Sequence, residues 1–153
     1  MKTRVIAVGK VREPYISAAL DDFRKRLARY GGLEEVEIAA SPGSDPARTM
    51  REEGERVVRT FVAGEPVWLL DRRGTALSSV ELSEKLQRLA TAGTPRLTLV
   101  VAGTYGADPA LFDRADFVWS LSSLTLLHEW ARALVVEQLY RAAKIARNEP
   151  YHH

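Results

Sequence analysis

The sequence predicts a single α/β domain, with a mostly parallel sheet and helices on both faces. Short β-branched apolar runs alternate with longer segments of helical spacing along the whole chain. With 153 residues the chain is long enough for one sizeable core. No internal repeat, low-complexity segment or long linker divides it. We therefore expect residues 1–153 to form one domain in which strands and helices alternate.

The composition is that of an ordinary soluble protein, with 46% hydrophobic and 27% charged residues. No apolar run approaches the roughly 20 residues that a membrane helix needs. The first residues, Met1-Lys-Thr-Arg, lead into a short β-branched run and lack the features of a signal peptide. We expect a cytoplasmic protein with no membrane segment.

The chain contains no cysteine, which excludes disulfides, thiolate catalysis and cysteine–zinc sites. Its three histidines do not have the spacing of a metal-binding motif, so we expect no metal. The net charge of +2 is too small for nucleic-acid binding through bulk charge, and any RNA contact should use a local basic patch. The basic residues that could contact phosphate are Arg24, Lys25, Arg29, Arg141, Lys144 and Arg147.

Proline, glycine and capping residues mark the elements of the first half. Pro14 suits a first helical turn, Gly31-Gly32 ends that helix, and Asp45 before Pro46 fits an N-cap followed by the first helical position. Alternation of Val36 and Ile38 indicates a half-exposed strand near an edge of the sheet. The expected elements are a strand over 3–8, a helix over 14–30, a strand over 34–40 and a helix over 46–63.

In the second half, Ser78 and Glu81 have the spacing of a capping box at the start of a helix. The stretch Asp71-Arg-Arg-Gly74 is typical of a turn. The expected elements are a strand over 66–70, a helix from 78 to about 93, a strand over 97–102, a short helix after Pro109, a strand over 117–121 and a long helix over about 129–147.

Two strands of the last third both open into small or polar loops, a pattern that predicts a ligand crevice at the carboxyl edge of the sheet. After the first strand, Gly103 and Gly106 form either a simple turn or a loop that lets a ligand approach backbone amides. The stretch lacks the dinucleotide-binding pattern and the lysine of a phosphate-binding loop.

After the second strand, Ser122, Ser123 and Thr125 either cap the last helix and satisfy the loop, or hold an adenine or ribose. A serine nucleophile is disfavoured because no Gly-x-Ser-x-Gly motif is present. His128 begins the last helix with Arg132 one turn later on the same face. His128 could equally be an ordinary surface histidine.

The run WSLSSLTLLHEWARALVVEQLYRAAKIARNEPYHH, from Trp119 to the end of the chain, resembles the C-terminal signature of the RlmH (YbeA-like) pseudouridine N3-methyltransferases. The stretches VIAVGKVREPYISAALDDFRKRLARY, LLDRRGTALSS and VVAGTYG resemble the rest of that family. The family belongs to the SPOUT superfamily. The resemblance implies an α/β fold with a C-terminal trefoil knot, S-adenosyl-L-methionine as cofactor, and a homodimer whose sites are completed near the interface. It also implies methylation at N3 of a pseudouridine in 23S ribosomal RNA, on assembled ribosomes.

The resemblance also implies roles for residues, carried over position by position. The S-adenosylmethionine contacts would be Leu70, Ala102, Gly103, Gly106, Leu121, Ser122, Ser123, Leu124, Thr125 and Leu126. The catalytic candidates are His128 and His152, as alternative proton acceptors, and Arg132, which would stabilise the imide anion or hold phosphate. The candidates for substrate binding are Arg141, Tyr151 and His153.

Three positions depart from the family pattern. Ala102 stands where the family has a first of two glycines, Leu127 where it has a proline, and His153 where it commonly has a basic residue. Two other readings therefore stay open at this point. One is a SPOUT methyltransferase acting on another target such as transfer RNA, and the other is an adenosine-binding scaffold protein without catalysis.

Overall fold

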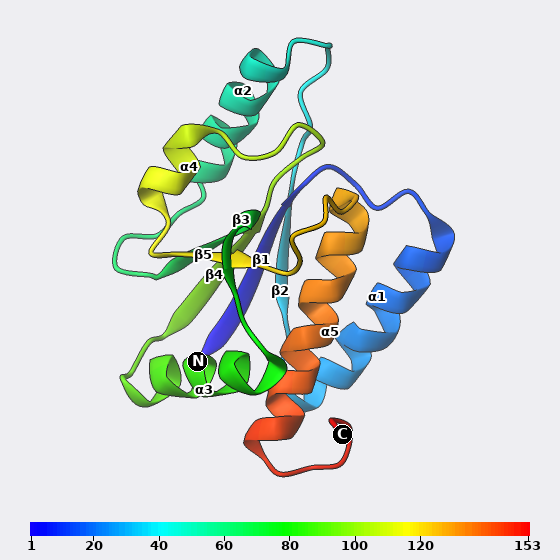
Figure 1. The fold of residues 1–153 in the computed structure, drawn as a ribbon, viewed down its shortest axis with the longest axis vertical. Coiled ribbons are helices and arrows are strands. Elements are labelled where there is room, and N and C mark those ends of the chain that lie inside the picture. The colour runs from blue at the N-terminus through cyan, green and yellow to red at the C-terminus, as the bar shows by residue number, and fades with distance from the viewer.

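The computed structural model describes residues 1–153 as one α/β layer structure (Figure 1). Five strands form one sheet in the order β2-β1-β4-β3-β5, and every neighbouring pair is parallel. The strands are β1 (Lys2–Val8), β2 (Glu34–Ile38), β3 (Val67–Ala76), β4 (Arg96–Val101) and β5 (Phe117–Ser120). The helices are α1 (Pro14–Leu27), the 3₁₀ turn η1 (Ala28–Tyr30), α2 (Pro46–Val58), α3 (Ser79–Thr91), α4 (Pro109–Arg114) and α5 (His128–Ala146). The predicted parallel α/β architecture is confirmed.

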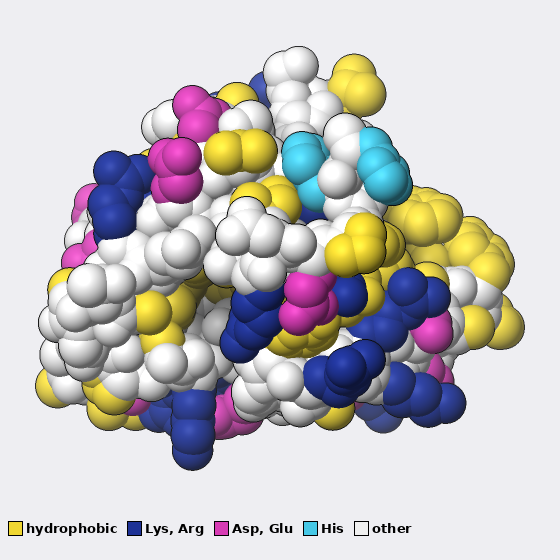
Figure 2. All heavy atoms as spheres, turned by 90° about the horizontal axis from the view of Figure 1, so that it is seen from below, with side chains coloured by type: hydrophobic (Ala, Val, Ile, Leu, Met, Phe, Trp, Pro, Cys, Tyr) yellow, Lys and Arg dark blue, Asp and Glu magenta, His cyan; other side chains and the backbone are white.

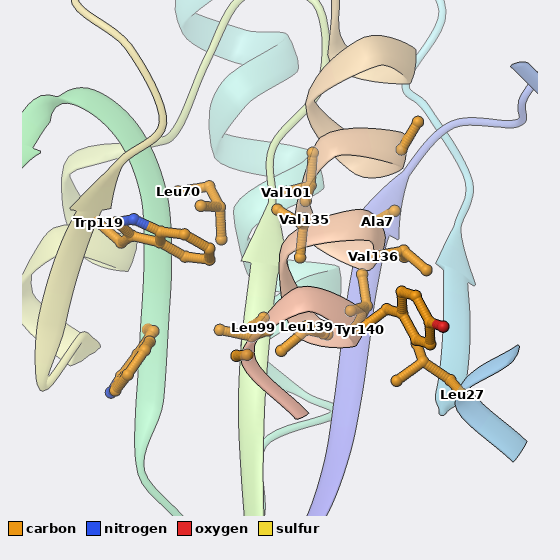
Figure 3. Packing of buried hydrophobic residues seen from close by; sticks show 14 of the residues in the cluster. Ala7, Leu27, Leu70, Leu99, Val101, Trp119, Val135, Val136, Leu139 and Tyr140 are labelled. Atoms are coloured by element: carbon orange, nitrogen blue, oxygen red, sulfur yellow. The ribbon is translucent and has the colours of Figure 1, made fainter. Parts of the chain in front are cut away.

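The helices divide between the two faces of the sheet, as the sequence predicted. Helices α1, α3 and α5 cover one face, and α2 and α4 cover the other. Successive residues of β1 serve both layers, because Val5 points into the α5 layer and Ile6 into the α2 layer. Figure 3 shows side chains of α5, among them Val135 and Leu139, packed onto the strands. The strands are thus buried on both faces, which holds their carboxyl ends in fixed register.

Helix starts follow the capping chemistry that the sequence predicted. Asp45 accepts a hydrogen bond from the backbone N–H of Arg48 with Pro46 in the first turn. Ser78 and Glu81 form a complete capping box at α3. Helix α2 ends at Val58, five residues before the predicted end, because the chain then turns.

The predicted turn at residues 71–74 is wrong. Strand β3 continues to Ala76, and Trp119 on β5 pairs with both Leu70 and Thr75, so residues 71–74 form a bulge within the ladder. Gly74 makes this possible, since a Cβ atom there would lie 2.4 Å from the backbone oxygen of Val118. Local residue preferences favour a turn here, but pairing with β5 determines the outcome.

No helix of the structure is both long and apolar enough to cross a membrane. After α5 the chain reverses at Asn148, which has a positive φ of 52°, and the last residues fold back beside the end of the helix. The C-terminus therefore lies at the end of α5 that is remote from the carboxyl edge of the sheet (Figure 1).

Candidate functional site

A cavity of about 590 Å³ opens at the carboxyl ends of β3, β4 and β5. Its volume falls in the range of small-molecule sites. Its walls are residues 70–73 at the β3 bulge and the segments that follow β4 and β5, and His128 and Ala131 of α5 also line it. The cavity lies where the sequence predicted a ligand crevice.

Nine of the ten residues carried over as cofactor contacts line this cavity. They are Leu70, Ala102, Gly103, Gly106, Leu121, Ser122, Leu124, Thr125 and Leu126. Ser123 is exposed and does not line it. The structure thus brings together residues that lie up to 56 positions apart in the sequence. That they bind a cofactor stays a prediction.

The wall after β4 is a tight turn whose first glycine allows a close approach. The N–H of Gly106 donates to the carbonyl of Gly103 at 3.0 Å, and Gly106 has a positive φ of 92°. A Cβ atom on Gly103 would lie 3.0 Å from Oε1 of Glu53 and 3.1 Å from Cγ1 of Val8. Gly103 therefore fits the turn closely between the cavity, α2 and β1.

The wall after β5 is held by serine side chains. The Ser120 hydroxyl donates to the carbonyls of Ser122 and Arg72, at 3.0 and 3.2 Å, and so ties this loop to the β3 bulge. Oγ of Ser122 accepts from the N–H of Leu124 at 3.0 Å. Helix α5 begins without a side-chain cap. Ser122 therefore satisfies the loop and does not cap the helix.

His128, the first residue of α5, presents its ring between the cavity and the end of β1. Its Nε2 atom lies 3.5 Å from the position of a Cβ on Gly9, and its Nδ1 atom is buried without a hydrogen-bond partner. An imidazole with an unpaired nitrogen next to a ligand cavity can accept a proton.

Glu53 is a buried acidic residue near the site that the sequence reasoning missed. Only 5% of it is exposed, and its Oε1 atom has no hydrogen-bond partner. Burial raises the pKa of its carboxyl group, opposed by the N–H of Ser41 and by the charges of Arg56 and His128. Its spacing of four residues from Thr49 and Val57, both buried, is the signal that could have found it.

Comparison with known proteins identifies the family. A family model described as "Predicted SPOUT methyltransferase" matches residues 1–152. The chain belongs to the SPOUT methyltransferase family. It is 39% identical to "Ribosomal RNA large subunit methyltransferase H" of Acetivibrio thermocellus, over 99% of both chains. It is 40% identical to the protein of the same name from Syntrophotalea carbinolica, again over 99% of both.

Solved structures agree with this SPOUT methyltransferase on the fold. The tRNA (m1G37) methyltransferase of Aquifex aeolicus matches with a TM-score of 0.58 at 17% identity, over 100% of this chain and 75% of that one. A probable methylase family protein from Haemophilus influenzae Rd KW20 matches with a TM-score of 0.56 at 14% identity, over 99% and 70% of the two chains. At these identities the likeness concerns the fold.

Arg132 of the methyltransferase points away from the cavity. It is buried, and its guanidinium donates to Glu37 at 2.8 Å and to Glu35 at 3.1 Å, which ties α5 to the edge strand β2. Burial disfavours ionisation of Glu35, but its bonds to Arg24 and Arg132 hold its pKa below the usual value. Arg132 does not line the cavity, so the structure shows it in ion pairs, and its catalytic role stays a prediction.

The C-terminal candidates form a separate cluster around Glu137. Arg141 donates to Glu137 at 2.7 Å and stacks on Tyr151, whose hydroxyl donates to the same carboxylate at 2.9 Å. Nδ1 of His152 lies 3.4 Å from Arg141. His152 and His153 are exposed, and Figure 2, which views this end, shows histidine side chains at the surface.

This cluster is remote from the cavity within one chain. Arg141 follows His128 by thirteen residues of α5, about 20 Å along a helix. The structure therefore does not bring Arg141, Tyr151, His152 and His153 together with the residues that line the cavity.

Arginine side chains stand at the mouth of the cavity on the β3 bulge. Arg73 is paired with Asp71 through a bond of 2.8 Å, whereas Arg72 is exposed and pairs with no acidic residue. Arg72 can therefore contact an anionic group that approaches the mouth.

Proposed function

We propose that this protein transfers a methyl group from S-adenosylmethionine to N3 of a pseudouridine in large-subunit ribosomal RNA. The observation that carries the proposal is the cavity at the carboxyl edge, lined by the three segments on which the cofactor contacts were expected. Relatives that are 36–40% identical over nearly their full length bear the name ribosomal RNA large subunit methyltransferase H. An enzyme with this substrate would work in the cytoplasm.

The residues of the cavity suit an adenosine-containing methyl donor. Leu70, Val101 and Leu126 offer apolar cover for a base, and Ser122 and Thr125 offer hydroxyls. A side chain at Gly103 would meet Glu53 and Val8, so the glycine lets the 103–106 turn keep its place beside the cavity. When bound, S-adenosylmethionine supplies a methyl group already activated on a sulfonium sulfur. The protein's task is then to position the nucleophile and remove its proton.

We assign the proton acceptor to His128. The imide nitrogen N3 carries a proton and is a poor nucleophile until the proton leaves. His128 is the histidine that lines the cavity, whereas His152 of the same chain lies beyond the other end of α5.

We further propose that the C-terminal half is knotted. Strand β5 lies at an edge of the sheet, yet α5 packs between α1 and α3. In the view of Figure 1 the chain that leaves β5 crosses the green segment that leads through β3 to α3, which is the arrangement that a threaded chain would give. Such threading is rare in proteins and shapes the loops that line the cavity.

The active form in this proposal is a homodimer. Apolar side chains are exposed at the start of α5 and on α1, with Trp130 at 44% and Tyr15 at 58%, their rings 5.8 Å apart. Leu127 and Leu134 extend this surface, which reaches the rim of the cavity at Leu124. A second copy covering this surface could bring its own C-terminal cluster to the cavity, which a single chain does not do.

The proposal is tested by incubating the protein with labelled S-adenosylmethionine and bacterial ribosomes that lack the modification. We expect one methyl group per large subunit, found by nucleoside mass spectrometry as N3-methylpseudouridine. Naked ribosomal RNA and transfer RNA serve as comparison substrates and should be methylated far more slowly. Label in transfer RNA alone, or none in any RNA, would contradict the proposal.

A further inference from the structure

Three buried polar atoms of the chain lack hydrogen-bond partners. One is Nε of Arg132, whose guanidinium is otherwise engaged by Glu35 and Glu37. The other two, Oε1 of Glu53 on α2 and Nδ1 of His128 on α5, belong to side chains beside the glycines that follow β4 and β1. Buried polar groups are nearly always hydrogen-bonded, so two unpaired atoms at one site call for an explanation. An unpaired buried carboxylate in particular costs stability, which points to a function that the fold alone does not require.

The glycines that end two neighbouring strands let both side chains approach the same place. Gly9, after β1, faces Nε2 of His128, and Gly103, after β4, faces both carboxylate oxygens of Glu53. Strands β1 and β4 are paired directly in register from Lys2 to Ala7. The carboxylate and the imidazole therefore come from opposite layers to adjacent strand ends.

No hydrogen bond joins Glu53 to His128, and each group has other polar neighbours. The carboxylate of Glu53 has Arg56 and Glu52 on its own helix, the N–H of Ser41 at 3.3 Å, and His128 from the opposite layer. Of these, Arg56 is engaged by the carbonyl of Ala39 and by Ser41.

On the other side, His128 has Glu129 beside it. Oε1 of Glu129 is already occupied by the N–H groups of Arg12 and Glu13. Burial raises the pKa of Glu53, and the charge of His128 is among the influences that oppose this rise. Burial also disfavours the charged form of Glu129, but the N–H groups of Arg12 and Glu13, with the charge of His128, hold its pKa below the usual value. Glu53 is the one with an unpaired buried oxygen.

We propose that Glu53 is a positioning residue, whose carboxylate at the neighbouring strand end stabilises the protonated form of His128 during methyl transfer. The step rests on the proposed function. The N3–H bond of the imide breaks and its proton passes to His128. The nitrogen's electron pair forms the bond to the methyl carbon, whose bond to the donor's sulfur breaks with its electrons left on sulfur. Glu53 does not touch the substrate, and its negative charge balances the imidazolium that forms.

The test uses Glu53→Gln, which keeps the shape and removes the charge, with Glu55→Gln as control on an exposed position of the same helix. In wild-type protein, NMR follows the pH at which His128 loses its proton. In E53Q we expect that loss at lower pH, with donor affinity within about twofold of wild-type. Identical His128 titrations in the two proteins would overturn the proposal.

Methyl transfer gives the second readout. In single turnovers on ribosomes we expect E53Q to be slower by at least about tenfold, with the acidic limb of its pH profile displaced to lower pH. In a His128→Gln background the same change should have little further effect, because Glu53 acts through the imidazole. An unchanged rate, or losses that multiply in the double variant, would contradict the role.

Failure of the proposed function would look different. If the wild-type protein did not methylate ribosomes at all, the NMR comparison would still decide whether Glu53 stabilises the His128 imidazolium. If E53Q did not fold, Glu53→Asp would replace it. That variant keeps the charge on a shorter side chain. His128 in Glu53→Asp should therefore lose its proton at a pH closer to that of wild-type, and the variant should retain more activity than Glu53→Ala.

Discussion

Oε1 of Glu53 lies 3.0 Å from the position that a Cβ atom would occupy on Gly103. The carboxylate of α2 therefore lies against the turn that forms one wall of the cavity. Because the carboxylate is buried and Val8 closes the other side at 3.1 Å, neither neighbour can move away easily. The position of the turn, and so the shape of the cavity, depends on the absence of a side chain at residue 103.

Gly103→Ala should therefore weaken donor binding. The added methyl group must push the 103–106 turn toward the cavity, and we expect the dissociation constant for S-adenosylmethionine to rise at least about tenfold, or about 1.4 kcal/mol. Calorimetric titration measures the change. The matched control is Ala102→Gly, which removes a methyl group from the neighbouring position and should bind the donor at least as well as wild-type.

Glu53→Gln should make the protein more stable at neutral pH. Burial raises the folded-state pKa of Glu53, so its contribution to stability is complete below the unfolded carboxyl pKa and is lost as pH rises through the folded value. At neutral pH the wild-type chain buries a charge that the variant lacks. We expect Tm to rise by roughly 2–4 °C at pH 7, with the difference vanishing near pH 4. A variant less stable than wild-type at pH 7 would show that the carboxylate is fully compensated.

Arg132→Ala should destabilise the fold. The change leaves the Glu35 carboxylate short of one buried partner and unties α5 from β2, which we expect to lower the free energy of unfolding by about 3 kcal/mol. Urea denaturation measures it. Arg48→Ala, which removes an exposed i,i+4 pair with Glu52, should leave the free energy of unfolding nearly unchanged. Equal losses in the two variants would show that the Arg132 network contributes little.

The exposed apolar surface around Trp130 predicts a dimer that a charge should break. We expect Leu134→Glu to shift the mass measured by analytical ultracentrifugation from dimer to monomer and to abolish methyl transfer, because burying a carboxylate in an apolar interface is unfavourable. Val80→Glu, at an exposed apolar position on α3, should leave the dimer intact. A monomeric wild-type protein that still methylates ribosomes would contradict the proposal that the active form is a homodimer.

Much of the fold follows from local sequence signals. The caps at Asp45 and Ser78 mark helix starts correctly, and β-branched runs mark the buried strands, because these signals depend on neighbours within one turn or one strand. The β3 bulge could not be predicted in this way. Residues 71–74 have turn chemistry, and only the pairing of both halves of β3 with Trp119 shows that the strand continues.

In the candidate site, too, the features set by local sequence could be predicted and those set by tertiary contacts could not. The loops that follow β4 and β5 could be located because parallel strands end at one edge. Glu53 could not be linked to Gly103, 50 positions later, since that contact depends on how α2 lies against the sheet. The ion pairs of Arg132 with β2, and the distance between His128 and the C-terminal cluster, likewise depend on the tertiary arrangement.

The measurement that tests the central claim most directly is calorimetric titration of the protein with S-adenosylmethionine, with ATP and NAD as controls. If the cavity at the carboxyl edge is the methyl-donor site, we predict binding of S-adenosylmethionine at about one site per chain, no comparable binding of ATP or NAD, and loss of affinity in Gly103→Ala. Absence of binding, equal binding of all three nucleotides, or affinity unchanged in Gly103→Ala would contradict it.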